Sequence, residues 1–348
     1  WCAGRMRLSL LTPIVLALAG TSVPPPTTPP VRVPRFPLAG LFVAEPDPVV
    51  PNGATGAWDD VFLDPGAVVV DTAGVVHMFY NGCNTFPGPV GMGYARSTDH
   101  GKTFTKLTPA PVFDSARAAN DHGVLASAAL IQDDGTWAMW YYTWEATVWP
   151  VAPSRIWRAT APAPEGPWTP DATPALEPGA DDSFDAGAVR TPSVLRDADG
   201  YRMWFTAVDR RGVSTVGYAT STDGLTWVKH PSPVLTPTGG TAFDGKSVLQ
   251  PRVTAGPDGF VMTYAGAVNF TTTSYRQSHG LAVSQDGITW RRGDGAVVKA
   301  SDFPGGGQLW YSALVWTGED YLLLPEVGHG GTTEVFAARH HGPLSIGG

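Results

Sequence analysis

The sequence repeats with a period of about 60 residues, and this repeat constrains the fold more than any other feature. Each copy begins with a short apolar run, passes a turn that usually carries Gly, and continues into an aromatic or apolar run. The five copies begin at Asp64, Ser127, Thr191, Gln250 and Tyr311, so successive starts are 63, 64, 59 and 61 residues apart. A fixed period of this kind is typical of propellers and solenoids.

Each copy has room for four short strands. In the third copy, two apolar runs are followed by VGYATSTDGLTWVKH from Val216, which reads as an alternating strand, an Asp-Gly turn and a second strand opening at Trp227. Four antiparallel strands per repeat, without a helical period, are typical of a propeller blade. A solenoid usually has shorter repeats, and a closed ring removes exposed sheet edges. We therefore predict an all-β fold, a five-bladed β-propeller, over residues 38–348.

The first 37 residues differ in composition from the repeats. Two arginines precede an apolar run from Leu8 to Leu18, and small residues follow, as in a secretory signal peptide. The apolar run is about half of the roughly 20 residues that a membrane span needs. We predict a cleaved signal peptide at residues 1–22, an extended Pro-rich linker at residues 23–37, and secretion to the extracellular space or the periplasm.

Charge and cysteine content exclude several classes of function. The chain has 23 Lys and Arg against 31 Asp and Glu, a net charge of −8, which disfavours nucleic acid and anionic membrane surfaces as partners. Cys2 and Cys83 are its two cysteines, and no His/Cys cluster has the spacing of a zinc site. We predict no metal ligands, no nucleic-acid partner and no membrane span; the oligomeric state stays open.

Three runs in the copies identify a family resemblance. They are LDPG from Leu63, DGYRMWF from Asp199 and STDGLTW from Ser221. They resemble the five-bladed glycoside hydrolases of families 43, 32, 68 and 130, a group of arabinanase-, levansucrase- and invertase-like enzymes. The resemblance covers roughly residues 40–345.

This resemblance implies a carbohydrate-active enzyme, a glycoside hydrolase acting on plant or microbial poly- or oligosaccharide. In it, carboxylates from different blades would surround one sugar in an axial funnel. No cofactor is required. A structural calcium ion in the central channel would be compatible with the resemblance, although the sequence offers no ligand loop for it.

The same resemblance implies that Asp64 is the nucleophile or the general base. Glycoside hydrolysis also needs a carboxyl group that donates a proton. The related families place further carboxylates in blades three and four, where this chain has Thr191 and Leu249. Asp185 and Glu326 are candidate replacements: Asp185 precedes a copy by six residues, and Glu326 follows the apolar run YLLLP, where burial would raise its pKa. Alternatively, Asp185 caps a turn and Glu326 is an exposed loop residue.

Other side chains predicted at this rim are candidates for substrate binding. The aspartates six residues before a copy could bind sugar hydroxyls or cap turns, and the arginines could hold hydroxyls, a carboxylate or a phosphate, or pair with nearby acids. The tryptophans at rim loops could stack on a sugar ring. The predicted binding residues are Trp58, Asn81, Asp121, Trp144, Arg190, Asp244, Arg252 and Trp310.

Two motifs are predicted to be structural. The runs from Ser97, Ser221 and Ser284 resemble the Asp-box of sialidases, which braces a turn between the third and fourth strands, far from the axis. Tryptophans at matching strand positions, such as Trp140 and Trp204, are predicted core residues. Two functions therefore remain: a secreted glycoside hydrolase, or a non-catalytic propeller that binds a glycan or another partner at the same rim.

Overall fold

The protein is described by a computed structural model in residues 35–85, 88–118, 123–144, 154–268 and 277–344. Within them lie five antiparallel sheets, which confirms the predicted all-β propeller. The predicted signal peptide and residues 23–34 of the predicted linker lie outside the described part. Phe36, at the end of that predicted linker, is buried and pairs with Gly293.

Four blades are formed by consecutive strands. Blade one has β2 (Phe62–Val70), β3 (Val76–Cys83), β4 (Gly91–Ser97) and β5 (Thr105–Lys106). Blade two has β6 (Leu125–Ile131), β7 (Trp137–Trp144), β8 (Ser154–Ala161) and β9 (Thr169–Pro170). Blade three has β10 (Ala188–Asp197), β11 (Gly200–Val208), β12 (Ser214–Ser221) and β13 (Val228–Lys229). Blade four has β14 (Ser247–Gly256), β15 (Gly259–Ala267), β16 (Gln277–Ser284) and β17 (Arg291–Val298).

Blade five is completed by the beginning of the folded chain. Its strands run in the order β18 (Gln308–Trp316), β19 (Asp320–His329), β21 (Ala338–His341) and β1 (Val43–Ala44), and β20 (Thr332–Val335) also pairs with β19. A 3₁₀ turn, η1 (Ala300–Asp302), precedes this blade. Pairing of β1 with β21 joins the two ends of the propeller, so the last blade takes its outer strand from residues that precede the first blade.

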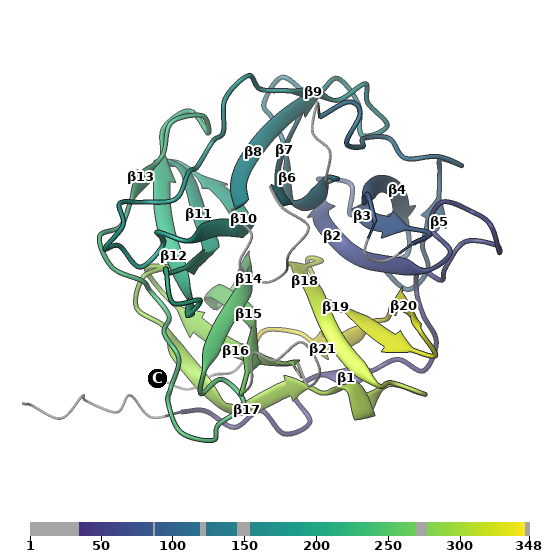
Figure 1. Cartoon of the computed structure of the whole chain (residues 1–348). Helices are drawn as coiled ribbons and strands as arrows, with labels where there is room; N and C mark the ends of the chain where they lie inside the picture. The colour runs from purple at the N-terminus through teal and green to yellow at the C-terminus, as the bar shows by residue number, and fades with distance from the viewer. Residues whose placement is uncertain (1–34, 86–87, 119–122, 145–153, 269–276, 345–348) are drawn as a thin grey trace, which may run out of the picture. The chain divides into compact units, whose positions relative to one another are not determined.

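The inner strands β2, β6, β10, β14 and β18 lie nearest the axis of the ring (Figure 1). Each has a register shift near its start, between Asp64 and Ala67 in blade one and between Arg190 and Ser193 in blade three, with equivalent shifts in the other three blades. A bulge of this kind bends a strand and re-aims its side chains. Gly66 lies in the first bulge with a φ of 53°, and a Cβ there would come within 1.9 Å of the Phe79 carbonyl oxygen. Glycine is therefore required two residues after Asp64.

Tryptophans lock neighbouring blades together. Trp140 of blade two donates its indole N–H to the Gly224 carbonyl of blade three (3.3 Å), and Trp204 of blade three donates to the Gly287 carbonyl of blade four (2.7 Å). Both side chains are fully buried. The predicted core role of these residues is confirmed, and each polar N–H has a partner, as burial demands.

The Asp-box-like runs brace turns between the third and fourth strands, as predicted. In blade three the Ser221 hydroxyl donates to Asp223 Oδ1 (2.9 Å) and accepts from the Gly224 N–H (2.8 Å). This turn joins β12 to β13 at the outer edge of the sheet. Among the described residues, no helix is long and apolar enough to cross a membrane.

Candidate active site

The site is centred on Asp64, which lies at the bulge of β2. Its Oδ1 atom accepts hydrogen bonds from the Gly66 N–H (2.7 Å) and from Asn81 Nδ2 (2.8 Å). Asn81 pairs directly opposite Asp64 on β3 and also bonds both backbone groups of Ala126 in blade two. Asn81 therefore fixes the orientation of the Asp64 carboxyl group. The other oxygen, Oδ2, is buried and has no hydrogen-bond partner among the described residues.

Glu326 supplies a second buried carboxyl group. It lies on β19, and its Oε2 atom accepts a hydrogen bond from the Tyr311 N–H (3.2 Å). Its Oε1 atom, like Asp64 Oδ2, is buried without a hydrogen-bond partner in the described part of the chain. Glu326 is 0% exposed and Asp64 1% exposed. The alternative that Glu326 is an exposed loop residue is therefore wrong.

Burial controls the protonation of this pair. Desolvation raises the pKa of Asp64 to about 7, although hydrogen bonds from Asn81 and Gly66 and the charge of Arg252 oppose the rise. Desolvation, followed by the negative charge of Asp64, raises the pKa of Glu326 well above its usual range. Because the two groups interact, they titrate as a pair. Burial and the neighbouring carboxyl group thus both favour the protonated form of Glu326.

Arg252 extends from blade four and contacts the inner strands of three other blades. Its Nε donates to the Ser312 carbonyl (2.7 Å), Nη1 contacts the carbonyls of Thr191 and Pro192 (3.5 Å each), and Nη2 contacts the Ser127 hydroxyl (3.4 Å). Burial lowers the pKa of Arg252, while the charge of Asp64 opposes the shift. A buried guanidinium therefore lies among the inner strands, and its charge favours the ionised form of Asp64.

This arrangement does not fit a calcium ion in the channel. Calcium needs several oxygen ligands, and here a resident cation already donates to the inner carbonyl oxygens of blades three and five. Within the described ranges, no group of three or more His, Cys, Asp or Glu side chains could hold a metal ion.

An aromatic and apolar cluster surrounds the carboxyl pair. The Tyr142 and Tyr311 hydroxyls are 2.9 Å apart, and burial raises the pKa of both. The cluster consists of Phe62, Cys83, Val90, Leu125, Tyr142 and Tyr311, with Trp310 packed against it. Burial also raises the pKa of the Cys83 thiol to about 11. The cluster explains why the site is poorly solvated.

Arg190 lies at the register position in blade three that Asp64 has in blade one, since they pair with Thr206 and Asn81 respectively. Its side chain is buried, and its positive charge lowers the pKa values of Tyr142 and Tyr311, against the larger effect of burial. Arg190 thus acts on the two tyrosines of the cluster beside the carboxyl pair.

The predicted acids Asp185 and Asp244 have a different role. Asp185 binds the Ser183 hydroxyl and forms an ion pair with Lys229 on β13. Asp244 forms an ion pair with Arg292 on β17 (2.6 Å). The cations come from β13 and β17, the outermost strands of their blades, and Asp244 also accepts a hydrogen bond from the Tyr264 hydroxyl (3.0 Å). The structure does not bring Asp185 together with Asp64 and Glu326, and its contacts favour the alternative role in a turn.

Blade one has an equivalent ion pair between an aspartate before its inner strand and a cation of its outermost strand, which was not predicted from the sequence. Asp59 binds Lys106 on β5 (2.7 Å) and the Tyr80 hydroxyl (3.2 Å). It lies five residues before the start of its copy, whereas the other aspartates lie six before theirs, so the spacing argument missed it. The three pairs fasten the turn before each inner strand to the outer edge of the blade.

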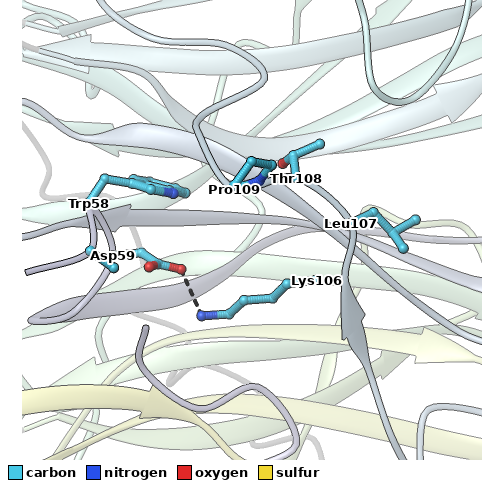
Figure 2. A pocket seen from close by; sticks show the side chains of 7 residues that line it. Trp58, Asp59, Lys106, Leu107, Thr108 and Pro109 are labelled. Carbon is cyan, nitrogen blue, oxygen red and sulfur yellow. Dashed lines mark hydrogen bonds and ion pairs between the residues drawn. The ribbon is translucent and has the colours of Figure 1, made fainter. Parts of the chain in front are cut away.

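The remaining predicted residues are placed as follows. Trp58 stacks on Tyr80, with ring centroids 5.7 Å apart, and lines a hollow of about 490 Å³ (Figure 2). Trp310 packs against the cluster beside the carboxyl pair. Asp121 and the side chain of Trp144 lie outside the described residues.

Thr191 and Leu249 stand where the related families carry carboxylates. The Thr191 hydroxyl binds that of Thr206 (2.5 Å), and Leu249 is buried.

A comparison of strand registers would have identified Glu326 more directly. Opposite the bulge, where blade five has Glu326, blades one, three and four have Tyr80, Phe205 and Tyr264. Blade two has Tyr141 at the aligned position, where it pairs with Ala126. Aligned on this position, the runs read MFYN, MWYY, MWFT, MTYA and LPEV. A carboxylate in a column of aromatic residues is the signal of an unusual local function.

Comparison with known proteins supports the fold. No known family profile matches the sequence. Two uncharacterised proteins, from two strains of Mycobacterium tuberculosis, are each 33% identical over 189 residues, which is 52% of this chain and 59% of each relative. The matched region therefore spans little more than half of those relatives.

Solved structures with similar folds are glycoside hydrolases. A glycosyl hydrolase from Bacteroides ovatus is 19% identical, with a TM-score of 0.62, over 86% of this chain and 92% of that protein. A thermostable family-43 glycoside hydrolase is 15% identical, with a TM-score of 0.61, over 85% and 92%. A third structure is described as belonging to the GH130 family of mannoside phosphorylases, which contains glycoside hydrolases that target β-1,2-mannosidic linkages in Candida mannan. It is 18% identical, with a TM-score of 0.64, over 87% of this chain and 96% of that protein.

These neighbours are five-bladed propeller glycoside hydrolases, and this chain shares their fold. At such identities the likeness establishes the architecture, while activity has to be argued from the site itself.

Proposed function

We propose that the protein is a carbohydrate-active enzyme, a glycoside hydrolase in which Asp64 and Glu326 form the catalytic pair. The observation that carries this proposal is the pair itself: two interacting, buried carboxyl groups, each with one oxygen that lacks a hydrogen-bond partner among the described residues. Buried polar atoms normally have partners, so such atoms indicate a ligand or a catalytic role.

The protonation of the pair suits this chemistry. Glycoside hydrolysis needs one carboxyl group to protonate the leaving oxygen and a second to attack the sugar or activate water. With its pKa well above the usual range, Glu326 holds a proton at neutral pH and is the proposed donor. Asp64, whose pKa is about 7, is the proposed nucleophile or base. Asn81 and Arg252 position Asp64 and stabilise its charge.

We further propose that the substrate is a plant or microbial poly- or oligosaccharide and that the protein acts outside the cytoplasm. The fold shared with glycoside hydrolases supports the substrate class, and the apolar run at Leu8 to Leu18 supports secretion.

A second candidate function is a non-catalytic propeller that binds a glycan or another partner. The burial of both carboxyl groups favours it, since a substrate would have to displace side chains of the surrounding cluster to reach them. Thr191 and Leu249, at the positions where related families have carboxylates, favour it as well.

Hydrolysis of aryl arabinofuranosides, xylosides, fructosides and mannosides separates the two candidates. We expect the wild-type protein to turn over at least one substrate, and the variants Asp64→Asn and Glu326→Gln to lose turnover by several orders of magnitude. Asp185→Asn is the matched control, because Asp185 is also a buried aspartate near the start of an inner strand but forms an ion pair with Lys229 on the outermost strand. Turnover that survives Asp64→Asn, or no turnover by any form while oligosaccharide binding persists, would reject the hydrolase.

A further inference from the structure

Two hollows lie on blade one, and Trp58 lines both of them. The outer hollow, of about 490 Å³, is also lined by Asp59, Lys106 and Thr108 (Figure 2). The inner hollow, of about 260 Å³, is also lined by Cys83, Val90, Gly91 and Pro111. A volume of a few hundred Å³ is in the range of small-molecule sites.

The inner hollow adjoins the carboxyl pair. Cys83 and Val90 belong to the cluster that contains Tyr311, whose backbone N–H binds Glu326. The charges of both Asp64 and Glu326 act on the Cys83 thiol. The outer hollow reaches Lys106 on β5, the outermost strand of the blade. The lining of the two hollows runs from Cys83 at the end of β3 to Lys106 on β5, and two strand spacings of about 4.8 Å make this roughly 10 Å.

Blades three and four show which features of this region are structural. Trp58 directly precedes Asp59, just as Phe184 and Phe243 precede Asp185 and Asp244. Phe243 stacks on Tyr264 with centroids 6.0 Å apart, as Trp58 stacks on Tyr80.

In blades one and four, the aromatic side chain before the aspartate packs against a glycine. A Cβ at Gly82 would approach Trp58 to 3.2 Å, and one at Gly266 would approach Phe243 to 2.7 Å. A phenylalanine ring is therefore sufficient to build this packing, and the larger indole of Trp58 provides additional surface that the packing does not require.

The outer hollow also has polar groups that suit sugar hydroxyls. The Asp59–Lys106 pair forms one side of it. The Thr108 hydroxyl is buried and has no hydrogen-bond partner among the described residues. A partly exposed indole beside charged and hydroxyl groups is an arrangement that suits a sugar, whose apolar face packs on the ring while its hydroxyls bond to the rim.

We infer that these two hollows form one binding groove for the part of an oligosaccharide that extends away from the cleaved bond, with Trp58 as its aromatic platform. The substrate is then an oligosaccharide or polysaccharide of three or more sugar units rather than a short glycoside. This inference rests on the proposed function for the direction in which the oligosaccharide lies, because the cleaved bond is placed at the inner end of the groove, beside Asp64 and Glu326.

The test uses Trp58→Phe, which gives blade one the residue type that blades three and four have at this position and should leave the packing intact. Binding of arabino-, xylo-, fructo- and manno-oligosaccharides of two to five units is measured by calorimetry in an Asp64→Asn background. We expect affinity to increase with chain length and Trp58→Phe to weaken binding of the longer chains about three- to tenfold, because the additional indole surface is lost. Trp227→Phe is the matched control, because blade one already has Phe104 at the corresponding place and Trp227 lies in blade three.

Two outcomes overturn the groove: affinity for all four series that does not depend on chain length, or equal losses in Trp58→Phe and Trp227→Phe. Hydrolysis of aryl glycosides by the wild-type protein is measured in parallel, so that catalysis and binding are scored separately. If no form hydrolyses any glycoside but Trp58→Phe still weakens oligosaccharide binding, the groove is supported and the hydrolase is rejected. If aryl glycosides are hydrolysed but Trp58→Phe leaves binding of longer chains intact, the groove alone is rejected.

Discussion

Asp64→Asn should make the protein more stable at high pH while removing its proposed activity. Folded Asp64 keeps its proton up to a pH of about 7, whereas an unfolded Asp releases it near its ordinary pKa of 3.8. Between these values the folded protein binds more protons than the unfolded chain, so the free energy of unfolding falls as the pH rises. At about 1.4 kcal/mol per pH unit, the ionised carboxylate costs up to about 4 kcal/mol above pH 7.

The substitution removes this cost without removing the contacts of Asp64. An Asn carbonyl oxygen can accept the hydrogen bonds from the Gly66 N–H and Asn81 Nδ2, and the amide nitrogen takes the place of the unpartnered oxygen. Urea unfolding of both proteins, at pH values from 4 to 9, measures the difference. We expect the variant to be more stable by a few kcal/mol at pH 8, with a gain that disappears toward pH 4.

Asp244→Asn is the control of opposite sign. Burial raises the pKa of Asp244, but hydrogen bonding by Thr238 and the charge of Arg292 outweigh this effect and lower that pKa below its ordinary value. This aspartate therefore stabilises the fold at neutral pH, and its contribution is lost as the pH falls through its folded pKa. If Asp64→Asn also destabilised the protein at pH 8, the argument that Asp64 is a costly buried carboxylate would be refuted.

Three further predictions concern catalysis, the channel and the outer turns. Activity should rise as Asp64 ionises around pH 7 and fall at higher pH as Glu326 loses its proton, and a profile that is flat from pH 5 to 9 would contradict the assigned roles. Arg252→Met should lower the free energy of unfolding by roughly 3 kcal/mol, because buried carbonyls and a carboxylate lose their partner. It should also move the rising limb of the pH–activity profile to higher pH, because the charge of Arg252 lowers the pKa of Asp64. An unshifted limb would show that Arg252 does not act on Asp64. Ser221→Ala should cost about 1 kcal/mol in urea unfolding and leave kcat unchanged, since its turn lies at the outer edge, and a loss of kcat would place that turn in the active site.

The repeat predicted the architecture because each copy has the turn and strand pattern of a complete sheet. The closing strand β1 could not be predicted in the same way. It has two residues, Val43 and Ala44, too few to show an alternating pattern, and its partner Arg339 is almost the whole chain away in sequence. Ring closure depends on contacts between the two ends of the propeller, which a local pattern does not record.

The candidate site was predicted in part, for a similar reason. Asp64 was named from the family resemblance and Glu326 from its place after an apolar run, and the structure brings their carboxyl groups into one interacting pair. The ion pair of Asp185 could not be predicted, because it depends on a cation 44 residues further along the chain. The sequence likewise indicated Arg252 as a rim cation but not that its guanidinium would contact backbone carbonyls from several blades.

The position of Glu326 argues for selection on function rather than on stability. At the aligned position, the other four blades bury an aromatic ring that is at most 1% exposed, so this place in a blade accommodates a large apolar side chain. Replacing such a ring by a carboxyl group loses apolar burial and adds the cost of desolvating a polar group. The two costs are compounded because Asp64 ionises in the same poorly solvated surroundings. Packing does not account for two such groups in one buried site, and the acid and base roles proposed for Glu326 and Asp64 would account for them.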